Sequence, residues 1–596
     1  MSGFVERLRE RKLVQWALAY IAAAFALIQI LDIVAQRFAW PEQAIRFVIV
    51  AAAIGFLATL VIAWYHGEHG AQRVSSTELL ILALLLGIGG VLALRLSPRS
   101  DAASAARPAV GTSAAAAAAD PHSIAVLPFV NMSGDKDNDY FSDGISEEIL
   151  NVLAGIPALH VAARTSSFSF RDGKHEAPEI AQELHVRLLL EGSVRKQGER
   201  ARITAQLIDA SNGYHLWSQT YDRDLKDIFA IQDEIAAAIA NELKVKIGAA
   251  DDSAAKKPRS AEAHDFYLRG LGQWQQRGEA SLFAAIKSFE GAIAADAQFA
   301  EAYAGLAVTY TILPDYSARI SYPEALDRAR DNAEIALSLD PSVPEIYVVL
   351  GYLADGERRR STAQALYHHA ATLRPSYATA YQWLGNSQWS GGDLKGGLAS
   401  LERASALDPR SSIIANNHGM VLSALGRYAE VIALCAATLK AKPADQNCLE
   451  TTSFATLLSG DYAAARPLYR RYARVTNTGE AALRTVDEVF DALEGHGDRH
   501  AIAVRLAAFG PQSSYDPRSG NAFGVYVIPP LLVLLGEPQL VLRNLEPFAL
   551  NDRSGQAEWA MMMKALGPLH CDAAFVDLVK RMRTNDPHYS ALCAKP

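Results

Sequence analysis

The chain has 596 residues, with 57 lysines and arginines, 65 aspartates and glutamates, and a net charge of -8. This length exceeds what one hydrophobic core organises, so we expect several domains or an extended repeat array. The acidic balance excludes the broad basic surface of a nucleic-acid-binding protein, and no nucleic-acid partner is expected.

Three apolar runs near the N-terminus predict membrane-spanning helices, at residues 14–35, 45–64 and 78–94. Each run is close to the ~20 residues that cross a bilayer. Basic residues cluster before the first run, from Arg7 to Lys12, and this predicts a cytoplasmic N-terminus. Three crossings would make the lipid bilayer a partner and place the remaining domains in the periplasm of a bacterial inner-membrane protein; an even number would invert this topology.

An alanine-rich segment at residues 98–121 predicts a flexible linker. After it, short runs of β-forming residues alternate with amphipathic stretches, which predicts a small α/β domain. The predicted strands are residues 123–130, 159–161, 187–195, 200–209 and 215–221, and the predicted helices are residues 143–153, 178–184 and 228–246.

Several phrases occur in a fixed order along this segment: Ile124-Ala-Val-Leu-Pro-Phe129, Tyr140-Phe-Ser-Asp-Gly-Ile-Ser-Glu147, Leu190-Glu-Gly-Ser-Val194, Ala205-Gln-Leu-Ile-Asp209, Leu216-Trp-Ser218 and Phe229-Ala-Ile-Gln-Asp233. Together they resemble the TolB-like, FlgO-related domain. That domain lies between a membrane segment and tetratricopeptide (TPR) repeats in relatives of CadC-like regulators and of some adenylate cyclases. The resemblance implies a non-catalytic extracytoplasmic module. The short segment before the first predicted span leaves no room there for a cyclase or a DNA-binding domain.

A regular spacing of prolines and glycines marks the next part of the chain. Prolines recur at one interval in the set Pro341, Pro375, Pro409 and Pro443, and glycines recur at the same interval in the set Gly351, Gly385 and Gly419. The interval is that of tetratricopeptide helix pairs, about 34 residues, and such pairs bury their apolar faces by stacking on one another. We therefore expect a solenoid of such pairs, followed by further helix pairs and a cap.

The first helices of such repeats line a groove that can hold an extended or helical segment of a protein partner. Polar and aromatic side chains at groove positions are the candidates for binding a protein or peptide ligand: Tyr352, Asp355, Gln382, Asn386, Trp389 and Asn416.

No motif for catalysis, a cofactor or a metal ion is found. There is no Walker A sequence, GxSxG elbow or kinase signature. The acidic stretch from Asp135 departs from a calcium-binding loop at Tyr140 and Ser146, and the pair His496 and His500 lacks the zinc-binding HExxH form. The four cysteines form no CxxC pair, and Cys435, Cys448, Cys571 and Cys593 could form two disulfides if the region is exported.

The predicted fold class is a multi-domain chain of three transmembrane helices, a small α/β domain and an all-α TPR solenoid. The predicted function is a non-catalytic periplasmic scaffold anchored to the inner membrane; the alternative is a transmembrane signalling receptor that acts through a separate cytoplasmic effector. The predicted segments are residues 1–13 (cytoplasmic), 14–97 (membrane), 98–121 (linker), 122–248 (α/β domain), 249–261 (linker), 262–512 (repeats) and 513–596 (C-terminal helix pairs and cap).

Overall fold

The computed structural model describes the chain from Asp120 onward. The described residues are 120–198, 200–224, 228–243, 260–317, 319–476, 479–509, 521, 523, 526–550, 556–582 and 593. The chain divides into two compact units, residues 1–114 and 115–596, and all described residues belong to the second.

The first described domain contains a six-stranded sheet in the order β3-β1-β4-β5-β6, with β2 paired to β4. Strand β1 runs parallel to β3 and β4, whereas β4, β5 and β6 are antiparallel neighbours. The strands are β1 (Ser123–Val126), β2 (Val130–Asn131), β3 (His160–Val161), β4 (Leu188–Gln197), β5 (Arg200–Asp209) and β6 (Tyr214–Asp224). All of β1 is buried, as expected for a strand in the parallel part of a sheet with both faces covered.

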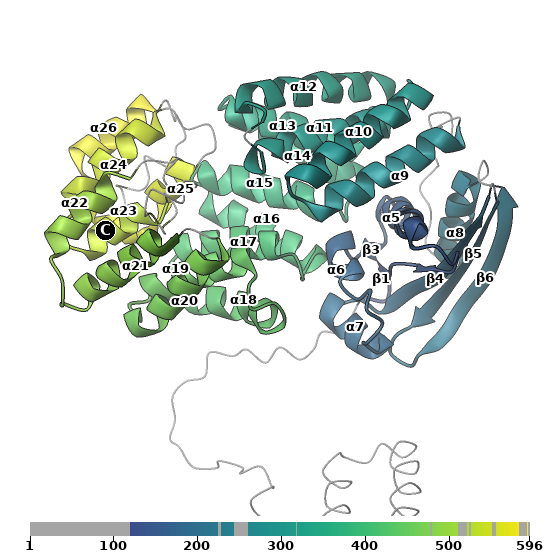
Figure 1. Ribbon diagram of the computed structural model, residues 1–596, viewed down its shortest axis with the longest axis horizontal. Coiled ribbons are helices and arrows are strands. Elements are labelled where there is room, and N and C mark those ends of the chain that lie inside the picture. The colour runs from purple at the N-terminus through teal and green to yellow at the C-terminus, as the bar shows by residue number, and fades with distance from the viewer. Residues whose placement is uncertain are drawn as a thin grey trace, which may run out of the picture. The chain divides into compact units, whose positions relative to one another are not determined.

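The described helices that cover this sheet are α5 (Asp139–Ala154), α6 (Arg164–Phe168), α7 (Ala177–Leu184) and α8 (Ile228–Glu242). Helices α5 and α8 share one apolar core with the sheet (Figure 1). Helix α6 packs against β1, and α7 packs against β4. The predicted order of strands and helices in this domain is found, with one difference: residues 123–130, predicted as one strand, form β1 and β2. The predicted helix at residues 228–246 ends outside the described residues, at 244–246. The five-residue helix α6 was not predicted, because its Arg-Thr-Ser-Ser-Phe sequence shows no apolar period.

The following helices stack as antiparallel pairs (Figure 1). They are α9 (Ala261–Gln276), α10 (Glu279–Ala295), α11 (Ala300–Ile312), α12 (Tyr322–Leu339), α13 (Pro344–Gly356), α14 (Arg360–Leu373), α15 (Ala378–Ser390), α16 (Leu394–Leu407), α17 (Ser412–Ala424), α18 (Tyr428–Ala441), α19 (Gln446–Leu458) and α20 (Tyr462–Val475). The first helices, α9 to α19 in odd numbers, contact one another from each pair to the next, so they form a continuous layer. The predicted helical repeat is confirmed.

The glycine that recurs once in each repeat is explained by the close packing of the two helices of a pair. Helix pairing brings Gly351 so close to the ring of Tyr367 that an added Cβ would lie 2.5 Å from Tyr367 Cε1. One repeat later Gly385 faces Leu401, with 2.7 Å between the added Cβ and Leu401 Cγ. Glycine at this position lets the two helices of a pair approach closely.

Further helices continue the array: α21 (Gly479–Leu493), α22 (Arg499–Ala507), α23 (Ile528–Leu534), α24 (Gln539–Ala549), α25 (Gln556–Met562), the 3-10 helix η6 (Lys564–Leu569) and α26 (Ala573–Arg581). They share one large apolar core with the later repeats. Helix α25 also packs against α15, and η6 packs against α17, so the chain returns to repeats that lie far earlier in the sequence.

The predicted fold class requires a correction. In the part of the chain that the structure describes, no helix has the length and apolar character needed to cross a bilayer. Helix α12, with 18 residues, carries charged side chains along its length. The structure supports a mostly helical TPR-like solenoid with a small sheet domain, and it does not support the three transmembrane helices or a bilayer contact through them. The segments on which those helices were predicted, residues 14–97, lie outside the described residues.

The sheet domain packs directly on the repeats. The backbone N–H of Ala163 donates to the carbonyl of Leu407 at 2.8 Å, and the backbone N–H of Val161 donates to Ser376 Oγ at 3.1 Å. The hydroxyl of Ser166 donates to Asp408 Oδ1 at 2.5 Å. These repeat residues lie in two successive connections between helix pairs, so the edge of the sheet at β3 rests on the solenoid.

Candidate functional site on the inner face of the repeats

Three columns of side chains follow the first helices, with one residue of each column per repeat of about 34 residues. We call these twelve positions the inner face: Val348, Gln382, Asn416 and Glu450; Tyr352, Asn386, Met420 and Phe454; Asp355, Trp389, Ser423 and Leu457. The six residues predicted to bind a partner all belong to it. The earlier repeats contribute most of its polar side chains, and the later repeats contribute Met420, Phe454 and Leu457.

Asp355 is the centre of a polar group between two repeats. Its carboxylate accepts hydrogen bonds from Tyr367 Oη at 3.1 Å and from Ser387 Oγ at 2.9 Å. Burial raises the pKa of Asp355 to about 6, although these two hydroxyls and Arg360 favour the charged form. The group therefore joins α13, α14 and α15 through one partly buried carboxyl.

Tyr352 lies one turn before Asp355 on the same helix. Its hydroxyl is 2.6 Å from that of Tyr322, and its ring meets the ring of Trp383 edge-on with 4.9 Å between centroids. Tyr352 is only half-buried. It therefore offers both aromatic surface and a hydroxyl to a partner.

Helix α15 supplies three further predicted residues. Gln382, Asn386 and Trp389 have exposed fractions of 9%, 7% and 1%, so they are much less accessible than a freely open groove would make them. Asn386 Oδ1 has no hydrogen-bond partner among the described residues. A buried amide oxygen without a partner is costly to the fold, and a hydrogen-bond donor from a bound segment would remove that cost.

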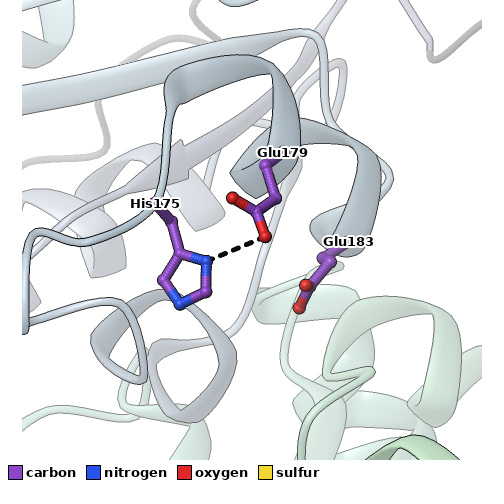
Figure 2. A group of neighbouring side chains, drawn as sticks. All are labelled: His175, Glu179 and Glu183. Carbon is purple, nitrogen blue, oxygen red and sulfur yellow. Dashed lines mark ion pairs between the residues drawn. The ribbon is translucent and has the colours of Figure 1, made fainter. Parts of the chain in front are cut away.

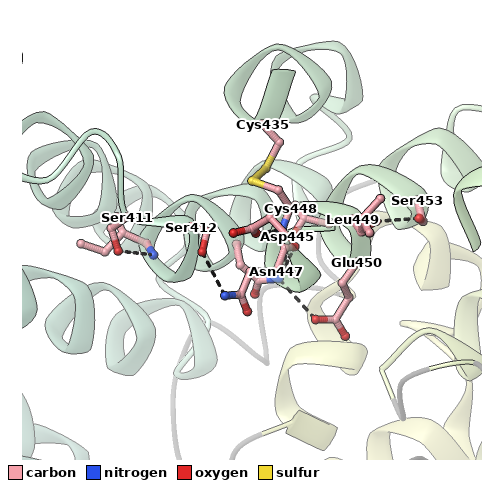
Figure 3. Close-up of a disulfide and its surroundings, with 12 residues drawn as sticks. Ser411, Ser412, Cys435, Asp445, Asn447, Cys448, Leu449, Glu450 and Ser453 are labelled. Carbon is pink, nitrogen blue, oxygen red and sulfur yellow. Dashed lines mark hydrogen bonds between the residues drawn. A yellow bond between two sulfur atoms is a disulfide. The ribbon is translucent and has the colours of Figure 1, made fainter. Parts of the chain in front are cut away.

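Asn416 belongs to a separate polar group, which includes Asn447 and Glu450 (Figure 3). Its amide donates to Thr451 Oγ1 at 2.6 Å and to the carbonyl of Asn447 at 3.1 Å, and Glu450 Oε2 lies at 3.4 Å. Burial raises the pKa of Glu450 despite hydrogen bonds from Tyr526, Tyr472 and Asn416. The structure thus gathers Tyr352, Asp355 and the α15 residues on neighbouring helices, and it places Asn416 with the following repeat.

Sequence reasoning missed several residues of these polar groups, among them Glu450 and Ser387. Glu450 follows Asn416 at a sequence separation of 34, so the same period that selected Asn416 would have found it. Ser387 lies beside Asn386 in the sequence, but its bond to Asp355 depends on how the helices pack, and the period carries no such information.

Two disulfides are present among the described residues. Cys435 on α18 pairs with Cys448 on α19, with 5.3 Å between their Cα atoms, and so joins consecutive repeats beside the Asn416 group (Figure 3). Cys571 pairs with Cys593 across a sequence separation of 22. The sequence had left both pairings open.

A cluster of metal-ligating side chains lies at the edge of the sheet domain, formed by His175, Glu179 and Glu183 (Figure 2). His175 Nδ1 and Glu179 Oε1 are 3.1 Å apart, and Glu183 pairs with Arg410 of the repeats at 3.0 Å. The guanidinium of Arg410 opposes a cation here. The cluster is better explained as ion pairs, one of which joins the sheet domain to the repeats.

Comparison with known proteins gives one curated relative and several solved structures. No family model matches the chain. A protein of Rhizobium meliloti (strain 1021), named "Putative adenylate cyclase 3", is 37% identical over 246 residues, which are 41% of this chain and 42% of the relative. The chain therefore spans less than half the length of the curated relative that it matches. The resemblance to the TolB-like domain stays a prediction.

Several of the similar solved structures are described as TPR proteins. A thermophilic TPR protein of Thermus thermophilus is 22% identical with a TM-score of 0.28, and the match covers 33% of this chain and 99% of that protein. A TPR protein of Parabacteroides merdae is 15% identical with a TM-score of 0.30, covering 46% of this chain and 100% of that protein. YrrB, described as a TPR protein with an unusual peptide-binding site, is 18% identical with a TM-score of 0.24, covering 32% and 93% of the two chains.

Proposed function

We propose that this protein is a non-catalytic scaffold that binds a segment of a protein partner along the inner face of its repeats. The observation that carries the proposal is the regular spacing of the inner face, to which successive first helices contribute one residue of each column per repeat, with polar and aromatic side chains on α13 and α15. A surface with this regularity can follow an extended or helical segment over several repeats.

Two features of the inner face support a binding role. Tyr352 presents a half-buried ring beside Trp383, and such aromatic groups contribute strongly to protein interfaces. Asn386 Oδ1 is a buried acceptor without a partner among the described residues, and a bound segment could donate to it. Both residues lie on the polar half of the inner face.

Affinity capture with the full chain tests the proposal. Tyr352→Ala and Asn386→Ala should each weaken retention of the same partner roughly tenfold, as expected for the loss of about 1.4 kcal/mol at an interface. Ile335→Ala is the matched control, because Ile335 is 42% exposed on the second helix α12. Thermal unfolding checks that each variant remains folded. Equal retention by all three folded variants would contradict the proposal.

We also propose that the repeats function in an oxidising compartment such as the periplasm. The support is the pairing of all four cysteines in two disulfides, because disulfides persist mainly outside the reducing cytosol. Mass spectrometry of the protein purified from its native source, alkylated without reductant, should find four blocked thiols. Four alkylated cysteines would contradict this proposal.

A second candidate function is a signalling regulator that acts through a separate effector. The match to the Rhizobium meliloti protein favours it through that protein's name, over 41% of this chain. Co-purification of nucleotide-cyclase activity with the full chain would support the regulator, whereas a partner captured without such activity would support the scaffold alone.

A further inference from the structure

The chain's own C-terminal segment packs on part of the inner face of the repeats. Trp389, Met420 and Phe454 belong to one buried apolar cluster with three consecutive methionines, Met561 to Met563. All of these side chains are at most 2% exposed. Residues 556–569 therefore pack on the part of the inner face that α15 and α17 provide.

The C-terminal segment crosses successive repeats in order. Glu558 pairs with Arg360, at the start of α14, with 2.7 Å between Oε2 and Nη2. Helix α25 then packs on α15 of the next repeat, and η6 packs on α17 of the repeat after that. Lys564 lies beside Gly426, where an added Cβ would be 2.8 Å from Lys564 Cδ. A short segment thus meets three repeats one after another, as a bound ligand would.

The ion pair between Arg360 and Glu558 fixes the position of this segment relative to the repeats. The side chains of Arg360 and Glu558 are 18% and 6% exposed, so the pair is largely removed from water. A buried ion pair adds little net stability over an apolar contact, but replacing Glu558 by a cation would place two positive charges together. The pair therefore selects a segment with a carboxylate at one position, and the methionines that follow within about two helical turns supply the apolar contact.

The segment on this surface consists of helices that are too short to be stable in isolation. Helix α25 has seven residues and η6 has six, and isolated helices of this length are unstable in water. The segment owes its conformation to the helices that it contacts, which are α15 and α17 of the repeats and α23 and α24 of the C-terminal region. A partner segment with the same chemistry would find the same contacts, and the covalently attached segment would compete with it at a high effective concentration.

We propose that the surface from Arg360 to Met420 is a docking site for a helical segment of a partner protein, and that residues 556–569 occupy this site in cis. The partner's segment carries a carboxylate followed by methionines or leucines. This inference rests on the proposed scaffold function and names the class of partner. Binding at this site requires the partner to displace the chain's own segment.

A charge exchange tests the proposal in the full chain. The probes are two fluorescein-labelled peptides of residues 556–570, one with the natural sequence and one with Glu558→Arg, followed by fluorescence anisotropy. The wild-type chain should bind both weakly. The Glu558→Arg chain should bind the natural peptide at least tenfold more tightly than the wild type does. The Arg360→Glu chain should prefer the arginine-bearing peptide at least tenfold, and the double variant should again bind both weakly.

Equal affinities of the four chains for both peptides, or no binding by either opened chain, would overturn the proposal. Thermal unfolding shows whether each chain is folded; if Glu558→Arg unfolds it, Glu558→Gln replaces it and should still bind the natural peptide more tightly than the wild type does, because Arg360 is kept. A dimer formed by the opened chains, detected by light scattering, would also overturn it, because a second copy would then be the occupant. Failure here with capture through Tyr352 intact would leave the scaffold function standing.

Discussion

At the scale of single residues, the close approach of paired helices predicts that alanine substitution has opposite effects on stability at two helical glycines. Gly351 faces the buried ring of Tyr367, so Gly351→Ala should destabilise the protein by about 1–3 kcal/mol through overpacking. At Gly272 on α9 an added Cβ would make only an ordinary contact, 3.6 Å from Tyr140 Cβ. Gly272→Ala should therefore stabilise by about 0.5–1 kcal/mol through helix propensity. Opposite shifts of the urea unfolding midpoint are expected, and shifts of the same sign would contradict the packing account.

The carboxyl of Glu301 on α11 should make the stability of the protein depend on pH. Burial, together with the nearby carboxyls of Asp340, Glu148 and Glu345, raises the pKa of Glu301 to about 7. The pKa of Glu301 is higher in the folded state than in the unfolded state. The contribution of Glu301 to stability is therefore complete below about pH 4.5 and is lost as pH rises through about 7.

The variant Glu301→Gln should remove this loss. It should unfold at a higher temperature than the wild type at pH 8, by on the order of 2 kcal/mol in stability, and should match it near pH 4.5. Glu290→Gln at an exposed position of α10 is the control and should follow the wild type at both pH values. An advantage of Glu301→Gln that is equal at both pH values would show that the carboxyl does not titrate in the fold.

The sequence alone selected some of the residues of the candidate site on the inner face. The repeat period selected Tyr352, Asn386 and Asn416, because it reports which positions share a face. It could not report that Asp355 meets Ser387 and Tyr367, because that contact depends on how three helices pack.

At the scale of elements, the disulfide between α18 and α19 is the testable feature. Both sulfurs belong to fully buried residues, Cys435 and Cys448, and the bond closes a loop with a sequence separation of 13. Loss of such a cross-link costs about 2–4 kcal/mol. The Cys435→Ala, Cys448→Ala double variant should therefore have a lower urea midpoint than the wild type, and reductant should lower the midpoint of the wild type more than that of the variant. An equal effect of reductant on both would contradict this account.

Most elements could be predicted because their signals are local. The strand pair around Gly198 was predicted nearly to the residue, from alternating apolar positions on both sides of a turn. The docking of the sheet edge on Ser376 and on the loop from Leu407 to Arg410 could not be predicted, since those contacts join residues that are far apart in the sequence and no local pattern links them.

At the scale of the whole molecule, the structure changes the predicted account in two ways. Three transmembrane helices are not supported by the described residues. The groove is not uniformly open, because residues 556–569 pack on α15 and α17. Sequence reasoning missed this cover because α25 and η6 are short and contact repeats far earlier in the chain, where no periodic signal links the two.

The most direct test of the central claim, that partners bind along the inner face of the repeats, is site-specific photo-crosslinking in the full chain. A photoreactive phenylalanine analogue replaces either Tyr352 on α13 or Ile335 on α12, and mass spectrometry identifies the cross-linked peptides. The account predicts that Tyr352 yields cross-links to one contiguous segment of a partner protein and that Ile335 yields none to it. Cross-links to that segment from Ile335, with none from Tyr352, would contradict the account and place the binding surface on the second helices.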